Sequence, residues 1–279
     1  MSNKKQPIVF ISAGHGGSDP GAVGNGLLEK NINLQIALAN GAELERHGVK
    51  VVYSRTKDEY DPVGQEVREA NASGADLAVS HHTNSTAGSK ADGSETFYYG
   101  SDPNGKLLAV YCEEETKKLG QNSRGVRARN DLWFIKATNM TAVLTESAFI
   151  NNAADISIID TVKEQQQFGQ AYAKAILKFL GITYKPVTTS QSSTGKVETV
   201  KVDYAQSFNK KYAGTYTVKS SDGLNMRAGA NTSKTLIKNV PNGTKVQCYG
   251  YFTKETDGTI WLLVSYKGYT GFMSKGYLV

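Results

Sequence analysis

The stretch that most constrains the fold is residues 8–17, IVFISAGHGG. Residues 8–11 form a short apolar run of β-branched and aromatic side chains, which is typical of a buried strand in a parallel sheet. The small residues 12–14 then allow the backbone to turn sharply off the end of that strand. His15 is therefore predicted to lie at the carboxyl edge of the sheet, where open α/β folds bind their ligands.

The segments that follow alternate between strand and helix patterns. Further strands are predicted at residues 49–54, 77–80, 94–99 and 142–145. Helices are predicted from just after Leu28 to Gly48 and over residues 65–72, 103–119 and 165–180. This alternation predicts an α/β domain over residues 1–182, with a mostly parallel sheet flanked by helices on both faces.

The composition of the sequence changes after the last predicted helix. Residues 183–212 are rich in Thr, Ser and Gln and poor in large apolar side chains, so they are predicted to form a linker. Residues 213–279 contain short alternating runs broken by turn signals such as PNG at 241–243. This pattern predicts a second, small all-β domain folded as a barrel.

Composition excludes several classes of partner. The net charge of +6 over 279 residues is mild, and no Lys/Arg-rich block is interleaved with aromatics, so no nucleic acid is expected to bind. No apolar run approaches the ~20 residues of a membrane span, so no membrane insertion is expected. The first residues lack the apolar core of a signal peptide, which predicts a cytoplasmic location on synthesis. Cys112 and Cys248 are far apart and are predicted to be free thiols.

Histidines and carboxylates stand at the ends of the predicted elements. His15 follows the first strand, the His81–His82 pair follows the third, Glu29 begins the first helix and Glu146 follows strand 142–145. These side chains can converge, because the carboxyl ends of parallel strands share one edge of the sheet. Two imidazoles and a carboxylate are a known donor set for catalytic Zn²⁺, and a carboxylate outside that set can act as a proton shuttle.

Residues 8–181 resemble the zinc-dependent N-acetylmuramoyl-L-alanine amidases. The matching segments are residues 14–17 (GHGG), 19–21 (DPG), 28–30 (LEK), Arg68 and Asn71 with 75–76 (AD), 80–84 (SHHTN) and 145–151 (TESAFIN). The resemblance implies that His15, Glu29 and His82 bind Zn²⁺ and that Glu146 is the catalytic residue. Asn84, in the same segment as His82, is expected to bind substrate.

The sequence departs from the family pattern at His81, where the family usually has an apolar residue. His81 therefore remains an alternative metal ligand to His82. Alternation along the strand favours His82, because His81 shares a face with Val79, which is expected to point into the core.

The last part of the chain, residues 216–279, resembles a bacterial SH3-like cell-wall-binding domain. Its marks are residues 223–229 (GLNMRAG), 240–244 (VPNGT), Trp261 and 268–273 (GYTGFM). Leu224, Met226 and Trp261 are predicted to belong mainly to the barrel core. Exposed tyrosines would be candidates for stacking on a wall sugar or peptide; the tyrosines considered are Tyr249, Tyr251, Tyr266 and Tyr269.

These resemblances imply a peptidoglycan hydrolase that cleaves the amide bond between muramic acid and L-alanine. Zinc would activate water, and Glu146 would act as general base and then general acid. A cytoplasmic enzyme needs release to reach the wall, by a holin-type pore or by lysis of the cell. The first route favours a phage or prophage endolysin, and the second a sporulation autolysin. Two alternative functions remain, a non-catalytic wall-binding protein and a zinc peptidase that cuts the stem peptide.

Overall fold

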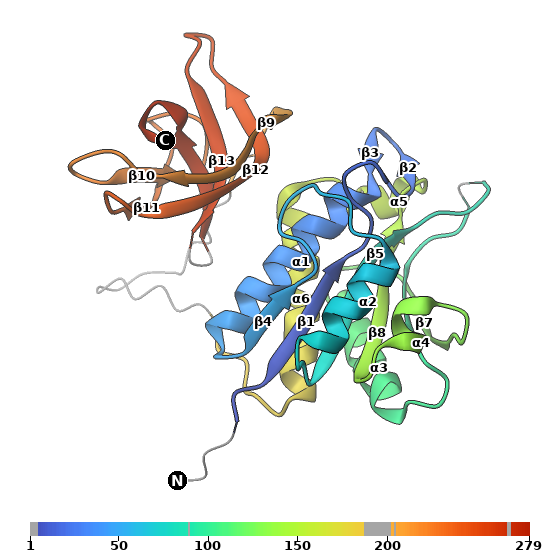
Figure 1. Ribbon diagram of the computed structural model, residues 1–279. Helices are drawn as coiled ribbons and strands as arrows, with labels where there is room; N and C mark the ends of the chain where they lie inside the picture. The colour runs from blue at the N-terminus through green and yellow to red at the C-terminus, as the bar shows by residue number, and fades with distance from the viewer. Residues whose placement is uncertain (1–4, 89, 187–201, 204, 267–268) are drawn as a thin grey trace, which may run out of the picture. The chain divides into compact units, whose positions relative to one another are not determined.

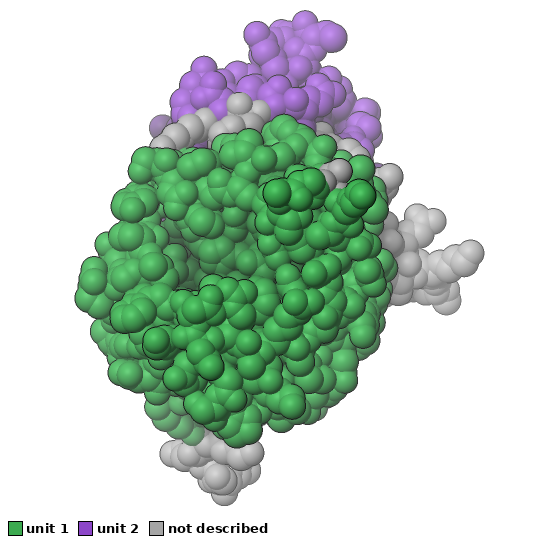
Figure 2. All heavy atoms as spheres, turned by 90° about the vertical axis from the view of Figure 1, so that its right-hand side faces the viewer, with its two compact units in different colours: residues 1–185 green, residues 186–279 purple. Residues whose placement is uncertain are grey.

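The computed structural model describes residues 5–88, 90–186, 202–203, 205–266 and 269–279. The chain divides into two compact units, Met1–Lys185 and Pro186–Val279, shown in different colours in Figure 2, where one face of the first unit is hollowed. The predicted linker, residues 183–212, includes residues 187–201, which lie outside the described residues.

Unit 1 is built on a six-stranded sheet (Figure 1). In spatial order its strands are β4 (Lys50–Tyr53), β1 (Ile8–Ala13), β5 (Leu77–Asn84), β8 (Thr141–Phe149), β6 (Ser94–Tyr98) and β7 (Ser123–Ala128). Every neighbouring pair is parallel except β6 and β8, which are antiparallel. The prediction of a mostly parallel sheet is therefore confirmed. The exception is that β6, together with β7, runs opposite to the other four strands.

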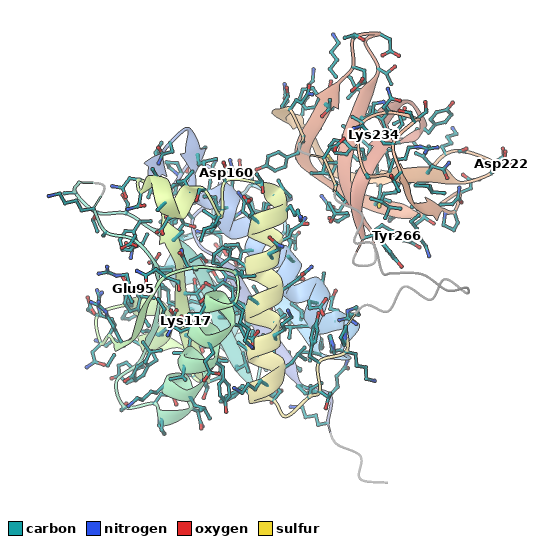
Figure 3. All side chains as sticks on the ribbon, turned by 180° about the vertical axis from the view of Figure 1, so that it is seen from behind. Glu95, Lys117, Asp160, Asp222, Lys234 and Tyr266 are labelled. Carbon is teal, nitrogen blue, oxygen red and sulfur yellow. The ribbon has the colours of Figure 1, made fainter. Side chains whose placement is uncertain are left out.

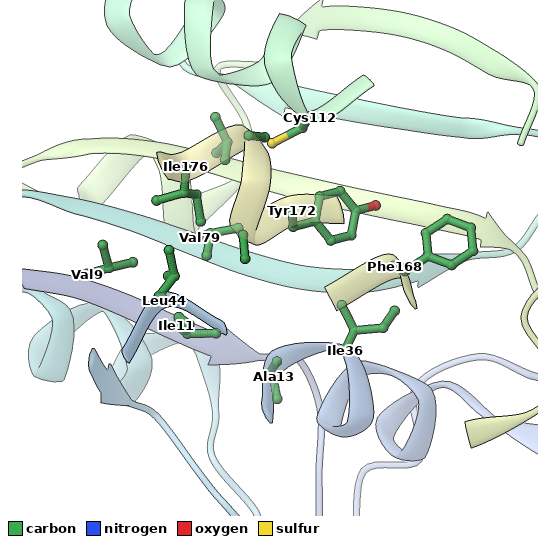
Figure 4. Close-up of a cluster of buried hydrophobic side chains, with 14 of the residues drawn as sticks. Val9, Ile11, Ala13, Ile36, Leu44, Val79, Cys112, Phe168, Tyr172 and Ile176 are labelled. Atoms are coloured by element: carbon green, nitrogen blue, oxygen red, sulfur yellow. The ribbon is translucent and has the colours of Figure 1, made fainter. Parts of the chain in front are cut away.

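Helices cover both faces of this sheet, as predicted. The three long helices α1 (Glu29–Arg46), α3 (Pro103–Lys117) and α6 (Val162–Phe179) pack on one face, which we call the closed face. Figure 4 shows its core, where Tyr172 and Ile176 of α6 lie close to Val79, and Phe168 lies further along the same helix. The opposite face, which we call the open face, is covered by the shorter helices α2 (Val63–Ala72) and α4 (Trp133–Ala137). Helix α5 (Ala153–Ile156) follows β8.

Alternation along the strands divides their residues between the two faces. Leu77 and Val79 of β5 belong to the core of the closed face, whereas Ala78 belongs to that of the open face. Likewise Val143 of β8 packs on the closed face and Leu144 on the open face. Continuing this alternation places His82 and Glu146 on the open face, because successive side chains of a strand point to opposite sides.

Two strands run further than their sequence pattern predicts. Strand β5 was expected to end at residue 80 and continues to Asn84, and β8 was expected to end at residue 145 and continues to Phe149. Glu146 therefore lies within a strand rather than after it. The reason is pairing on both sides, since β8 continues its register with β5 and also pairs with the inverted strand β6.

Unit 2 is an antiparallel six-stranded sheet, which confirms the predicted all-β domain. Its strands are β9 (Ser207–Thr217), β10 (Leu224–Arg227), β11 (Leu236–Val240), β12 (Lys245–Lys254), β13 (Ile260–Tyr266) and β14 (Tyr269–Ser274), followed by a 3₁₀ turn at Lys275–Tyr277. Strand β9 begins at Ser207, so folded structure starts before residue 213, where the barrel was expected to begin.

The barrel core contains Met226, with Leu224 partly buried against it. Trp261 is buried but lies outside this core cluster and lines a surface groove, so the prediction that it belongs to the barrel core is confirmed only in its burial. Tyr251, Tyr266 and Tyr269 are partly buried rather than exposed, and the side chain of Tyr249 lies outside the described residues. The sequence did not single out Tyr277, which is 52 % exposed.

Cys112 and Cys248 are both free and buried, in different units, as predicted. Within the described residues, no helix is long and apolar enough to cross a membrane.

Candidate metal centre and active site

Three side chains from distant parts of unit 1 meet at the carboxyl edge of the sheet. His15 follows β1, Glu29 is the first residue of α1 and His82 lies near the end of β5. The Oε1 atom of Glu29 lies 3.2 Å from Nε2 of His15 and 3.0 Å from Nδ1 of His82. One potential ligand atom from each residue fits within a 4.8 Å cluster, which the structure forms from residues that the sequence had singled out.

Glycines allow these side chains to approach one another. A Cβ atom on Gly14 would lie 2.2 Å from Cε1 of His82, so only a glycine leaves room for that imidazole ring. Gly21 has a φ of +65°, and a Cβ atom there would lie 2.6 Å from Oε2 of Glu29. His15 itself has a φ of 65°, which is uncommon for a residue with a side chain and turns its ring towards the cluster.

Asp19 is a residue of this site to which the sequence analysis assigned no role. Its Oδ2 atom lies 2.9 Å from Nδ1 of His15, and its Oδ1 atom accepts a hydrogen bond from the Gly21 backbone N–H. A carboxylate in this position fixes the orientation of a metal-binding imidazole and raises its basicity. The signal in the sequence was the acidic residue four positions after His15.

The electrostatics of the cluster favour a cation. Burial acts to raise the pKa of Glu29, but hydrogen bonds from His15 and His82 hold it well below its usual range. Burial acts to lower the pKa of His15, but Glu29 and Asp19 outweigh it and raise that pKa to about 9. The carboxylates of Glu29 and Asp19 therefore lie beside the two imidazoles, and their negative charge favours binding of a cation. Two imidazole nitrogens and a carboxylate oxygen match the donor set of a catalytic zinc site, so the residues fit Zn²⁺.

Glu146 lies beside the cluster, in the same row across the sheet. It is paired with His82 of β5 in parallel register and with Glu95 of β6 in antiparallel register. Its Oε2 atom is inaccessible and has no hydrogen-bond partner among the described residues. Burial, followed by repulsion from Glu29 and Glu95, raises the pKa of Glu146 well above the usual carboxyl value, while Arg129 opposes the shift.

Glu95 is the next carboxylate along this row, and Figure 3 labels it. Its Oε1 atom accepts a 2.9 Å hydrogen bond from the side-chain amide of Asn84. Its Oε2 atom lies 3.4 Å from Nε of Arg124 and 3.2 Å from Nε of Arg127. The Asn84 side chain, predicted to bind substrate, thus holds Glu95, and its Oδ1 atom accepts from the Ser85 N–H. Glu95, Arg124 and Arg127 are not among the residues that the sequence pattern marks as candidates for the site.

His81 lies on the closed face, away from the cluster. It is fully buried, and its ring nitrogens lie 2.9 Å from Nδ2 of Asn40 and 2.8 Å from Oγ1 of Thr145. Burial, assisted by His82, lowers the pKa of His81 to about 3, so the ring is neutral. The structure thus brings His82, and not His81, to the cluster, as strand alternation predicted.

Unit 2 carries a groove of about 370 Å³ on its own surface. Its lining includes the edge of Trp261, the exposed ring of Tyr277, and charged groups of both signs from Arg227, Glu255 and Asp257. An aromatic surface with a few convergent polar groups is typical of a ligand-binding groove.

Comparison with known proteins relates both units to described families. Residues 9–178 match the family model described as N-acetylmuramoyl-L-alanine amidase. Residues 222–279 match the model of the bacterial SH3 domain.

Individual relatives cover between 60 % and 70 % of the chain. The N-acetylmuramoyl-L-alanine amidase LytC of Bacillus subtilis is 38 % identical over 174 residues, which are 60 % of this chain and 35 % of LytC. The endolysin of Bacillus phage SPP1 is 35 % identical over 208 residues, covering 70 % of this chain and 76 % of the endolysin. The solved structure of the amidase AmiC2 of Nostoc punctiforme has a TM-score of 0.60 and 31 % identity, covering 64 % of this chain and 99 % of AmiC2. The chain thus spans about a third of the length of LytC.

Proposed function

The chain belongs to the N-acetylmuramoyl-L-alanine amidase family, and from that premise we propose that it is a peptidoglycan hydrolase. Its proposed reaction is hydrolysis of the amide bond that joins N-acetylmuramic acid to the L-alanine of the stem peptide. The observation that carries the proposal is the row formed by the His15–Glu29–His82 cluster and Glu146 beside it, whose buried Oε2 atom has no hydrogen-bond partner among the described residues.

In this proposal His15, Glu29 and His82 hold one Zn²⁺ ion. When bound, zinc supplies an electrophile that acidifies water and polarises the amide carbonyl. Asp19 orients the ring of His15 through its 2.9 Å contact, and Gly14 leaves the space that the ring of His82 occupies. Both imidazoles are partly exposed, so the cluster is accessible to substrate.

Glu146 is the proposed proton carrier. It takes a proton from the water whose oxygen forms the new C–O bond, and it donates that proton to the nitrogen as the C–N bond breaks. The amine then leaves as the free amino terminus of L-alanine. A raised pKa suits this double role, because a carboxyl group that titrates nearer to neutral pH both accepts and returns a proton readily.

We propose that unit 2 binds the cell wall. The support is its match to the bacterial SH3 domain and the aromatic groove that contains Tyr277 and Trp261. For biological origin we propose a phage or prophage endolysin, released through a holin-type pore, with a sporulation autolysin released by lysis as the alternative. The SPP1 endolysin supports the first origin, and the sporulation-specific N-acetylmuramoyl-L-alanine amidase of Bacillus subtilis, which is 34 % identical over 194 residues, keeps the second open.

The proposed reaction is tested by digesting purified peptidoglycan with the full chain and identifying the products by mass spectrometry. We expect new L-alanine amino termini and muramic acid with a free lactyl carboxyl group, and we expect their formation to stop with a chelator and resume with Zn²⁺. New termini inside the stem peptide with intact muramyl–alanine bonds would instead identify a zinc peptidase. Binding without any cleavage would identify a non-catalytic wall-binding protein.

A further inference from the structure

Two arginines beside the proposed active site have guanidinium N–H donors without aligned hydrogen bonds to the described residues, although the guanidinium group of Arg124 also lies 5.1 Å from the centre of the Phe149 ring. Arg124 and Arg127, both on β7, approach the same oxygen of Glu95 through their Nε atoms. Neither guanidinium group makes an aligned hydrogen bond to any residue that the structure describes, and their side chains are 30 % and 51 % exposed. One carboxylate thus faces two cations, which leaves net positive charge on this ledge of Glu95, Arg124 and Arg127.

Two other arginines of unit 1, Arg55 and Arg129, are engaged much more fully. Arg55 is buried and donates to four backbone carbonyl groups, those of Ala13, Gly14, Lys30 and Lys57. Arg129 makes two parallel 2.7 Å hydrogen bonds to Asp131. The contrast matters because a guanidinium group carries five N–H donors in a planar fork that matches a carboxylate. On the ledge, that fork is still available to a ligand.

The order of residues across the sheet indicates on which side of the scissile amide the ledge lies. The row runs from His82 through Glu146 to Glu95, on adjacent strands about 5 Å apart. If Glu146 protonates the leaving nitrogen, the acyl group lies on the His82 side and the peptide extends over Glu95 towards β7. A stem peptide that continues along this row would reach the ledge with its first residues.

We propose that Arg124 and Arg127 recognise a free carboxylate on the peptide side of the scissile amide. This inference rests on the proposed amidase function. The group of matching chemistry is the α-carboxylate of the γ-linked glutamate that follows L-alanine in a stem peptide. Glu95 positions the two guanidinium groups and is itself held by Asn84. In this reading the ledge selects peptidoglycan with free glutamate carboxyl groups over peptidoglycan in which these are amidated.

The test compares two matched substrates, uncrosslinked glycan–tetrapeptide strands with the glutamate α-carboxyl group either free or amidated. We expect the wild-type chain to cleave the free form with a kcat/KM at least about tenfold higher, as a charge-assisted bidentate contact implies. Arg127→Gln should bring this ratio close to one, mainly by raising KM for the free form. Arg127→Lys should recover part of the preference, because it restores charge without the fork.

The ratio of kcat/KM between the free and the amidated substrate distinguishes recognition of the carboxylate from an indirect effect of the substitution on Glu146. A change in the field at Glu146 alters the cleavage of both substrates equally and leaves the ratio unchanged. Arg46→Gln is the matched control, since it breaks an arginine–glutamate ion pair in the last turn of α1, the end opposite to Glu29, and should leave the ratio at the wild-type value. Equal cleavage of both substrates by the wild type, or a proportional loss in Arg127→Gln, would overturn the inference and leave the amidase function standing. Cleavage of neither substrate would overturn both.

Discussion

The two faces of the central sheet use the same residue types for opposite purposes. On the closed face, His81 lies between Asn40 and Thr145, and the hydroxyl group of Tyr172 lies 3.0 Å from Ser147. These groups pair with one another beneath the three long helices, although Oδ1 of Asn40 has no hydrogen-bond partner among the described residues. On the open face, at the same level of the sheet, oxygens of Glu146, Ser12 and Ser80 have no hydrogen-bond partner among the described residues.

Strand β5 therefore supplies a structural residue to one face of the sheet and a proposed metal ligand to the other. Buried polar groups are normally satisfied, and those left unsatisfied call for a functional explanation. His81 and His82 are neighbours in the sequence, yet alternation gives the first to the core and the second to the metal cluster.

Replacing the two histidines in turn should produce opposite defects. His82→Ala removes one of three proposed ligands, so we expect it to lose stoichiometric zinc and at least about a thousandfold in activity, the equivalent of ~4 kcal/mol. His81→Ala should keep its zinc but lose about 2–4 kcal/mol of unfolding free energy, because it leaves a cavity and two unpaired polar groups. Metal analysis and denaturant unfolding check both variants. Zinc retained by His82→Ala but lost by His81→Ala would reverse the assignment.

Asp19→Asn should weaken metal binding without removing it. The variant keeps the size of the side chain but no longer presents a carboxylate to Nδ1 of His15. We expect the zinc dissociation constant to rise about 10–100-fold, as for other partners of metal-binding histidines. Competition with a chelator measures this constant. An unchanged value would show that Asp19 only shapes the loop.

Glu95→Gln should shift the pH dependence of hydrolysis. A general base must be ionised, so activity falls as the pH drops through the pKa of Glu146, which its surroundings raise. Removing the negative charge of Glu95 lessens the repulsion, lowers that pKa and moves the acid limb of kcat/KM to lower pH. A pH–rate profile measures the limb, and the wild-type chain at equal zinc loading is the control. A shift to higher pH would contradict the proposed role of Glu146.

Asp61→Asn should have the smallest effect, on stability alone. Asp61 is 4 % exposed on the open face, and burial together with repulsion from Glu66 and Glu69 raises its pKa to about 7. A raised pKa favours the protonated form in the folded state, so stability is lost as the pH rises from the unfolded pKa near 4 to about 7. The variant should therefore melt a few degrees higher than the wild type at pH 8 and at nearly the same temperature at pH 4. A lower melting temperature at pH 8 would contradict this.

Much of the open face could be predicted from the sequence because its signals are local. His15 follows an apolar run and lies between glycines, and His82 follows from strand alternation in a segment that also resembles the amidase family. Glu29 begins a helix with a clear apolar pattern. A parallel sheet then brings these distant residues to one edge, whatever the length of the connections.

What the sequence did not predict depends on pairing between distant strands. Strand β7 contains two arginines and a glycine in SRGVRA, so it has little strand character of its own and forms by pairing with β6. The inverted direction of β6 is also not encoded by a local pattern. The pairing of β6 with β8 and β7 therefore places Glu95 and its two arginines near Glu146, and this pairing could not be predicted from the sequence.

The most direct test of the central claim is the zinc content and hydrolytic rate of Glu146→Gln. This variant removes the proton carrier while the three proposed zinc ligands stay in place. We expect one equivalent of Zn²⁺, as in the wild type, and a loss of peptidoglycan hydrolysis of about a hundred- to ten-thousandfold. Hydrolysis at close to the wild-type rate would contradict the account, since proton transfer would not need the carboxylate at position 146.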